Sequence, residues 1–277
     1  MPPGSRPPFN HPPLALTVLE IRYPELPENA GRRVRYDLRE AVRDRLPLVE
    51  NMTENRVELS FATVAPAVQT RTFPRFTTRD RTTATVVKEQ ALVIETTAYE
   101  GWHESFRPLV VNVVDALMRA NQPDGVLRIG LRYIDEIRVP SVDSVPGDWR
   151  GFIDEHLLAA ADPEFIPSLL KPTVWQGVVK YHTSSDSTLT VRYGPQDGHA
   201  VDPDGVTRRR NPPKSGPFFL LDSDSAWEAT GDVPEFDLEA IMNICDRLHE
   251  PTREFFDIAV TDKLRTEVFG GRKESGQ

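Results

Sequence analysis

Three consecutive arginines, Arg208, Arg209 and Arg210, are the most conspicuous charged feature of the sequence. They lie, with Lys214 nearby, in a long loop predicted over residues 194–216, and loops of that length in a compact domain are typically functional or disordered. Guanidinium groups bind phosphate and carboxylate oxygens through paired hydrogen bonds. The cluster is therefore a candidate binding site for an anionic ligand, a nucleic acid or an acidic partner. A solvated loop is the alternative interpretation, and the sequence favours it.

A second candidate site combines Glu95 and His103 with Arg128 and Arg132. The two arginines are four residues apart in a predicted strand, so they point to the same face of a sheet. Such a pair fits an anion-binding or partner-facing surface. If all four residues converged in one pocket, they would suit an enzyme acting on a phosphorylated metabolite. Ion pairs with Glu58 or Glu95 across the sheet are the alternative that we favour.

Common catalytic and cofactor motifs are absent from the sequence. It contains neither of the glycine-rich phosphate-binding patterns nor the G-x-S-x-G elbow of hydrolases. Its six histidines include no pair at i, i+3 or i+4, as a metal-binding helix would need. The single cysteine, Cys245, falls on the apolar side of a predicted helix, which favours a buried thiol over a nucleophile. We therefore predict no catalytic residue, metal site or cofactor, and lean towards a protein that is not an enzyme.

The elements that must position these residues alternate between short strands and amphipathic helices. Apolar and polar residues alternate in the clearest strand, 126–139, and recur at helical spacing from about residue 105 to 123. Strands are also predicted over residues 14–22, 57–61, 72–79, 83–88, 91–98, 173–183, 187–193 and 217–222. Helices are predicted over residues 32–46, 149–160 and 237–249, and a last one restarts after Pro251.

Local antiparallel runs with helices between them favour an α+β fold over a doubly wound one. We predict two antiparallel-sheet halves, each followed by long amphipathic helices, with a possible internal duplication. The first half covers residues 14–139 and the second covers residues 149–269, joined by a segment rich in Pro, Ser, Gly and Asp. A proline-rich disordered tail is expected over residues 1–13 and a flexible tail over residues 270–277.

Charge is distributed unevenly along the 277 residues. The 33 basic and 42 acidic residues give a net charge of −9, but residues 1–138 carry +1 and residues 139–277 carry −10. This acidity argues against coating nucleic acid or anionic membrane. No apolar run approaches the roughly 18–20 residues that a membrane-spanning helix needs. With one cysteine and no signal-peptide pattern, we expect a cytoplasmic protein with no membrane partner.

Several short motifs together resemble those of a sporadically distributed bacterial protein family of uncharacterised function. The resemblance spans residues 14–268, and it implies no reaction, cofactor or catalytic residue, because none is established for that family. The matching residues look architectural: Gly101 and Pro108 shape the entry into a helix that Trp102 and Phe106 anchor. The motifs are T-A-Y-E-G-W at 97–102, F-R-P at 106–108, R-I-G-L-R-Y-I at 128–134, E-I-R-Y-P at 20–24, L-L-D at 220–222, L-H at 248–249 and T-D-K-L-R at 261–265.

The leading functional hypothesis is a non-enzymatic binding or accessory protein. Patchy distribution across genomes is typical of conflict or defence systems, so such a system or a regulatory one is the expected context. The partner would be another protein or a second copy of the chain as a homodimer, held by the arginine-bearing sheet or the basic loop. One alternative is an enzyme or sensor acting on a nucleotide or other phosphorylated metabolite. A nucleic-acid-associated regulator is the other.

Overall fold

Nine strands form one antiparallel sheet in the computed structural model, which describes residues 9–26, 30–58, 67–159, 170 and 172–271. Their order across the sheet is β2-β3-β4-β5-β1-β6-β9-β8-β7. The central strands β1 and β6 pair with each other, and β5 and β9 flank them. The strands are β1 (Leu14–Arg22), β2 (Leu48–Glu58), β3 (Ala67–Thr77), β4 (Thr83–Val87), β5 (Ala91–Thr96), β6 (Arg128–Ile137), β7 (Gly177–His182), β8 (Ser187–Gly198) and β9 (Gly216–Glu228).

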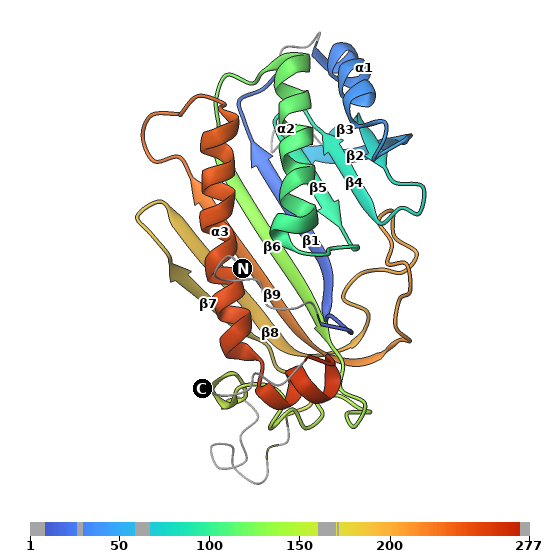
Figure 1. The fold of residues 1–277 in the computed structure, drawn as a ribbon, viewed down its shortest axis with the longest axis vertical. Coiled ribbons are helices and arrows are strands. Elements are labelled where there is room, and N and C mark those ends of the chain that lie inside the picture. The colour runs from blue at the N-terminus through green and yellow to red at the C-terminus, as the bar shows by residue number, and fades with distance from the viewer. Residues whose placement is uncertain (1–8, 27–29, 59–66, 160–169, 171, 272–277) are drawn as a thin grey trace.

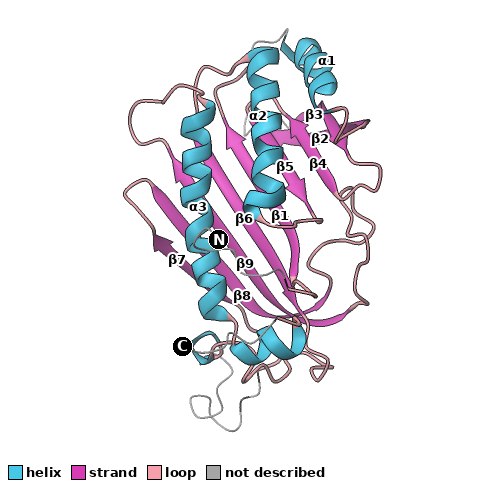
Figure 2. Cartoon of the chain, viewed as in Figure 1, coloured by secondary structure: helices cyan, strands magenta, loops and turns pink. Residues whose placement is uncertain are grey.

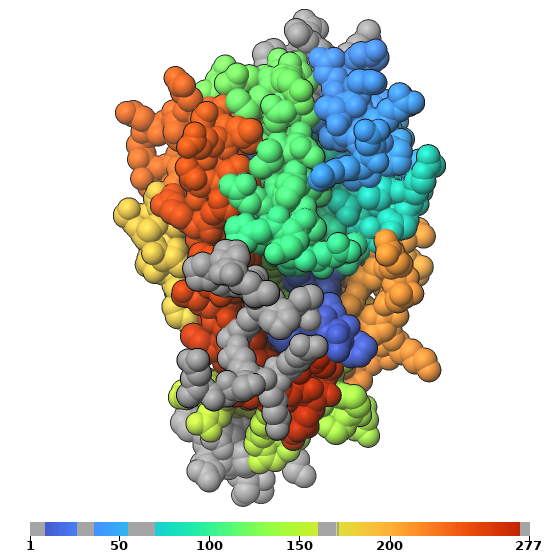
Figure 3. Space-filling model, in the orientation of Figure 1, coloured from blue at the N-terminus to red at the C-terminus, as the bar shows by residue number. Residues whose placement is uncertain are grey.

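The long helices lie side by side on one face of this sheet (Figures 1 and 2). They are α1 (Ala30–Val42), α2 (Arg107–Asn121) and α3 (Leu238–Ala259). A π-helical turn, η1 (Trp102–Phe106), leads into α2, while η2 (Glu155–Leu157) and η4 (Leu264–Val268) are single short turns. The space-filling view shows this helical side of the molecule (Figure 3). We call it the helix face and the opposite side of the sheet the open face.

Alternation along the central strands separates the two faces. In β1, Leu19 and Ile21 are fully buried beneath the helices, whereas Val18 and Glu20, which alternate with them, are only partly buried and face the other way. β6 repeats the pattern, with Leu131 towards the helix face. Because successive side chains of a strand point to opposite sides, one face supplies the core and the other meets solvent.

The expected arrangement in two sheet halves, each followed by long helices, is wrong. β6 hydrogen-bonds to β1 on one side and β9 on the other, so the sheet continues without a break between residues 14 and 228. After β6, the described chain continues through η2 and strands β7, β8 and β9, and α3 is the one long helix that comes after it. Periodicity reports whether a segment is a strand but not which strand it pairs with. The combination of helices and strands that defines an α+β protein is confirmed.

Two of the predicted helices differ from the structure. Within residues 149–159, the described part of the helix expected at 149–160, the only helical turn is η2. The C-terminal helix does not restart at Pro251, because α3 runs through that residue. Proline removes one backbone hydrogen bond there, but Leu248 and Thr252 on either side are buried. Their packing against the sheet holds the helix together across the proline.

The N-terminal segment is packed against the chain end from Phe9 onward. The Phe9 ring lies 5.1 Å from the Phe269 ring, and the His11 N–H donates to the Phe269 carbonyl at 3.0 Å. Asn10 donates to the Gly270 carbonyl, also at 3.0 Å. Residues 9–13 of the tail predicted at 1–13 are therefore fixed, and residues 1–8 lie outside the described residues.

Candidate functional site

The predicted basic loop crosses the open face as a strap. This strap, residues 199–215, joins β8 to β9 but lies against the far side of the sheet, over the β3–β4 turn and β5. The Arg208 N–H donates to the Arg81 carbonyl at 2.8 Å, and the Thr97 hydroxyl donates to the Arg208 carbonyl at 2.6 Å. The Arg210 guanidinium pairs with Asp80 at 2.7 Å. The strap thus connects strands of the second part of the chain with those of the first.

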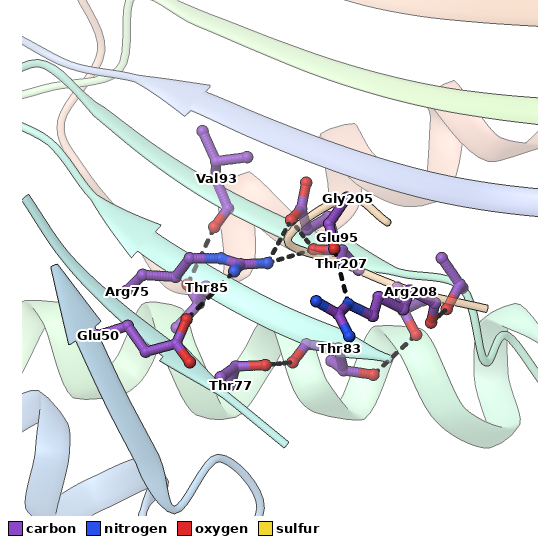
Figure 4. Close-up of polar contacts among 12 residues, drawn as sticks. Glu50, Arg75, Thr77, Thr83, Thr85, Val93, Glu95, Gly205, Thr207 and Arg208 are labelled. Carbon is purple, nitrogen blue, oxygen red and sulfur yellow. Dashed lines mark hydrogen bonds and ion pairs between the residues drawn. The ribbon is translucent and has the colours of Figure 1, made fainter. Parts of the chain in front are cut away.

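A buried arginine lies beneath the strap (Figure 4). The side chain of Arg75 on β3 is 2% exposed, and its guanidinium lies 3.2 Å from Glu95 and 3.6 Å from Glu50. The strap residue Thr207 completes the contact, because its hydroxyl accepts from Arg75 and donates to Glu95. A buried charge is costly unless it is paired. Glu95 therefore serves to neutralise Arg75 and to fasten the strap.

The second arginine of the predicted cluster is directed inward. The Arg209 side chain is 18% exposed and lies 3.3 Å from Glu136, whose side chain is 1% exposed. Burial lowers the pKa of Arg209, and Glu136 acts in the opposite direction. Glu136 also accepts hydrogen bonds from Arg138 at 2.7 Å and from the Ala200 N–H at 2.9 Å. One carboxylate at the end of β6 thus anchors both the start and the middle of the strap.

Arg128 and Arg132 lie on the open face of β6, as their spacing predicted, but with other partners than expected. Arg132 forms a two-pronged ion pair with Asp222 of β9, at 2.6 and 2.7 Å. Arg128 lies 3.3 Å from Glu20 of β1 and 3.4 Å from Glu228 of β9. The predicted partners, Glu58 and Glu95, were wrong because the neighbours of β6 proved to be β1 and β9.

The four residues of the predicted pocket do not converge. Glu95, Arg128 and Arg132 share the open face, but each is engaged by a different partner. His103 lies in η1 on the helix face, where its side chain is exposed. The sheet therefore separates His103 from the other three, and the single pocket that the enzyme hypothesis required is not formed.

The open face of β6, β9, β8 and β7 carries a row of cations that the sequence analysis missed. Arg192 of β8 lies 3.6 Å from Asp222, the carboxylate that Arg132 also binds. Asp222 is 4% exposed, whereas the side chains of Arg132 and Arg192 are 44% and 40% exposed. Lys180 of β7 is exposed on the same face, beside Thr190. We call Arg132, Arg192 and Lys180 the basic stripe.

The helix face holds a polar cluster that the sequence analysis also missed. Asp246 of α3 accepts hydrogen bonds from Trp102 at 2.7 Å and from Arg107 at 2.9 and 3.0 Å. Burial alone would raise the pKa of Asp246, but these donors outweigh it and the pKa lies below its ordinary value. Gly101, with φ of 126°, provides the backbone turn before η1. The cluster joins η1 and α2 to α3.

Two further titratable groups lie deeper on this face. His249 of α3 stacks on Trp102 with ring centres 5.2 Å apart, and its Nδ1 lies 2.9 Å from the Tyr133 hydroxyl. Burial lowers the pKa of His249 to about 4, so the ring is neutral at pH 7. Asp135 is 6% exposed, and no group in the described residues forms a hydrogen bond or ion pair with its carboxyl group. Burial, with a smaller effect of Asp222, raises the pKa of Asp135 to about 8.

The alternation of β6 was the signal that could have revealed Asp135. Its position places it on the same side as Ile129, Leu131 and Tyr133, which are all buried. An aspartate in an apolar register is unusual without a charged partner. Within the described chain, no group of three His, Cys, Asp or Glu residues is arranged to hold a metal ion.

A scan against protein-family models found no match, and a search of curated proteins found no relative. The family resemblance noted in the sequence stays a prediction. Among the described helices, none is long and apolar enough to span a membrane.

Proposed function

We propose that this chain is a non-catalytic binding protein that docks an acidic protein surface on the open face of β6, β9, β8 and β7. The observation that carries the proposal is the basic stripe. Its Arg132 and Arg192 share the buried carboxylate of Asp222, and the half-buried Asp224 lies opposite Arg132 on the same face. The stripe therefore carries three cations against two carboxylates. Lys180 extends the positive charge to the sheet edge.

The long helices all lie on the opposite side, which leaves this part of the sheet to meet a partner (Figure 2). The strap covers β3 to β5 and does not bond to β7. The stripe is flanked by Val178, which is 59% exposed, and by the partly buried Val18 and Leu16. Exposed cations beside partly exposed apolar side chains are the composition of a protein–protein contact.

A protein partner fits this surface better than a single-stranded nucleic acid. Sheets that bind single strands stack bases on exposed aromatic rings. The aromatic strand residues on the open face of the described chain, Phe73 and Phe218, are both buried.

The proposal is tested by reversing the charge of the stripe. Arg192→Glu/Lys180→Glu is the variant of choice, because removing Arg132 would leave the buried Asp222 without its main partner. Arg39→Glu/Arg43→Glu is the matched control, since Arg39 in α1 and Arg43 just after it are both exposed on the other side of the molecule. Both variants make the same change in net charge.

The probe is poly-L-glutamate, titrated by calorimetry at low salt. We expect the wild type and the control to bind it, and the stripe variant to bind at least about tenfold more weakly. Binding should weaken as salt is raised, because exposed charges are screened. Equal binding by the two variants would exclude the stripe as the docking surface. Tighter binding of oligo-dT than of polyglutamate to the wild type would refute the proposed partner class.

A further inference from the structure

A half-open cavity of about 180 Å³ lies where the chain after α1, the β3–β4 turn, the end of β5 and the start of α2 meet. None of the predicted site residues contributes to it, and it is remote from the basic stripe. Its lining residues are Arg45, Leu46, Thr78, Thr83, Thr96, Ala98, Ser105, Phe106 and Leu109.

The inner wall of this cavity is apolar. Leu46, Phe106 and Leu109 are buried in the core and present hydrocarbon to the cavity. The polar lining groups are already bonded within the protein: the hydroxyls of Thr83 and Thr96 lie 2.8 Å apart. A ligand body placed here would therefore exchange water for apolar contact, which is favourable.

The hydroxyls of Thr78 and Ser105 are also engaged. The Thr78 hydroxyl accepts from the N–H groups of Thr82 at 3.1 Å and Thr83 at 3.2 Å. The Ser105 hydroxyl donates to the Gly101 carbonyl at 2.9 Å. These bonds fix the shape of the wall.

The rim carries one cation that the described residues leave without a side-chain partner, Arg45, whose side chain is exposed. Its neighbours in the strap and the β3–β4 turn differ from it in this respect. Arg81 lies 2.7 Å from Glu50, and Arg210 lies 2.7 Å from Asp80. Arg81 and Arg210 thus neutralise Glu50 and Asp80, whereas Arg45 pairs with no side chain of the described residues.

We propose that this cavity binds a small organic acid, with an apolar body of about one ring against Leu46, Phe106 and Leu109 and its acid group on Arg45. The size fits, because an engineered apolar cavity of roughly 150 Å³ holds benzene. The planar guanidinium matches a carboxylate through two parallel hydrogen bonds. This inference goes beyond the proposed partner docking and concerns a separate site.

The test uses benzoate as the probe and benzyl alcohol as its uncharged counterpart, both followed by amide chemical shifts. A ligand of this size should bind with a dissociation constant on the order of 1 mM. We expect shifts centred on Leu46, Ala98 and Phe106. No shift at these residues with benzoate at about 50 mM would overturn the proposal.

Three variants separate the parts of the site. Arg45→Gln should weaken benzoate binding by about fivefold, as expected for one exposed ion pair, and leave benzyl alcohol unchanged. Arg43→Gln, on an exposed arginine two residues away, is the matched control and should change neither. Ala98→Phe should fill the cavity and abolish binding of both probes. Equal benzoate affinity in wild type and Arg45→Gln would refute the assigned role of Arg45.

Discussion

At the residue scale, three buried ionisable side chains differ in how their charge is compensated. Asp135, Arg75 and Asp222 are all buried, but they differ in their partners. Arg75 has two carboxylates and Asp222 has two arginines. Asp135 has no such compensation in the described chain. Because the cost of an unpaired buried charge shifts the equilibrium towards the neutral form, Asp135 makes stability depend on pH.

Asp135→Asn should remove this dependence. Burial raises the pKa of Asp135 from 3.8 to about 8, so the folded protein holds a proton between about pH 4 and pH 8 that the unfolded chain releases. The contribution of this proton to the free energy of unfolding is complete below pH 4. It is lost as pH rises towards 8, by at most about 1.4 kcal/mol per pH unit. Urea denaturation at pH 5, 6, 7 and 8 should show the wild type losing stability relative to Asp135→Asn.

The comparison isolates Asp135 because His249 is present in both proteins. The pKa of His249 is lowered to about 4, so its effect on stability falls on the acid side and cancels in the difference. Asp197→Asn, on an exposed aspartate, is the control and should follow the wild type at every pH. Parallel pH profiles of wild type and Asp135→Asn would contradict the prediction.

Arg75→Met should be among the most destabilising substitutions on the open face. It leaves Glu50 and Glu95 facing each other without their shared cation, and breaking a buried pair in this way costs roughly 3–5 kcal/mol. Arg71→Met on the same strand removes an exposed pair with Glu89 and should cost at most about 1 kcal/mol. Denaturant midpoints measure both. A similar loss of stability in the two variants would show that the buried ion pairs of Arg75 contribute no more than the exposed pair of Arg71.

At the scale of elements, local patterns were predicted better than the contacts between elements. Most strand positions followed from alternation, and the buried face of α2 followed from its apolar spacing, as with Val113 and Leu117. The contacts of the strap did not follow from any local pattern, because three adjacent arginines are typical of a solvated loop. Their partners Asp80 and Glu136 lie 130 and 73 residues away from Arg210 and Arg209. Nothing in a local window identifies pairs at such separation.

Thr207→Val should loosen the strap without unfolding the sheet. Its hydroxyl joins Arg75 to Glu95, and losing a hydrogen bond to a charged group costs about 1.5–3 kcal/mol. Hydrogen exchange at the Arg208 amide, which bonds to the Arg81 carbonyl, should become at least about tenfold faster. Val206→Ala, on an exposed neighbouring side chain, should leave that rate unchanged. An unchanged rate in Thr207→Val would mean that the strap is held elsewhere.

At the scale of the whole molecule, the sequence predicts how charge is distributed along the chain but not how the two parts of the chain pack together. The unequal charge of the two parts was readable from the sequence, but the strap shows that they are not electrostatically independent. Arg209, in the acidic second part, pairs with Glu136 at the end of the first. The sequence did not reveal on which face of the sheet each candidate residue lies, because that depends on how the strands pair. His103 and Glu95 were therefore expected together but lie on opposite faces.

The continuous sheet predicts that the whole chain unfolds in one transition. The pairing of β6 with both β1 and β9 buries their shared core under α2 and α3, so neither part can lose its strands without exposing the other. Trp102 belongs to the buried cluster beneath α2, and Trp149 belongs to a second cluster near the end of α3. Variants retaining one of these tryptophans, with the others replaced by Phe, report on each cluster separately. Coincident denaturation curves are expected, because coincidence of independent probes is the mark of two-state unfolding. Two separate midpoints would instead support the division predicted between residues 139 and 149, and would mean that the β1–β6 contact does not couple the two clusters.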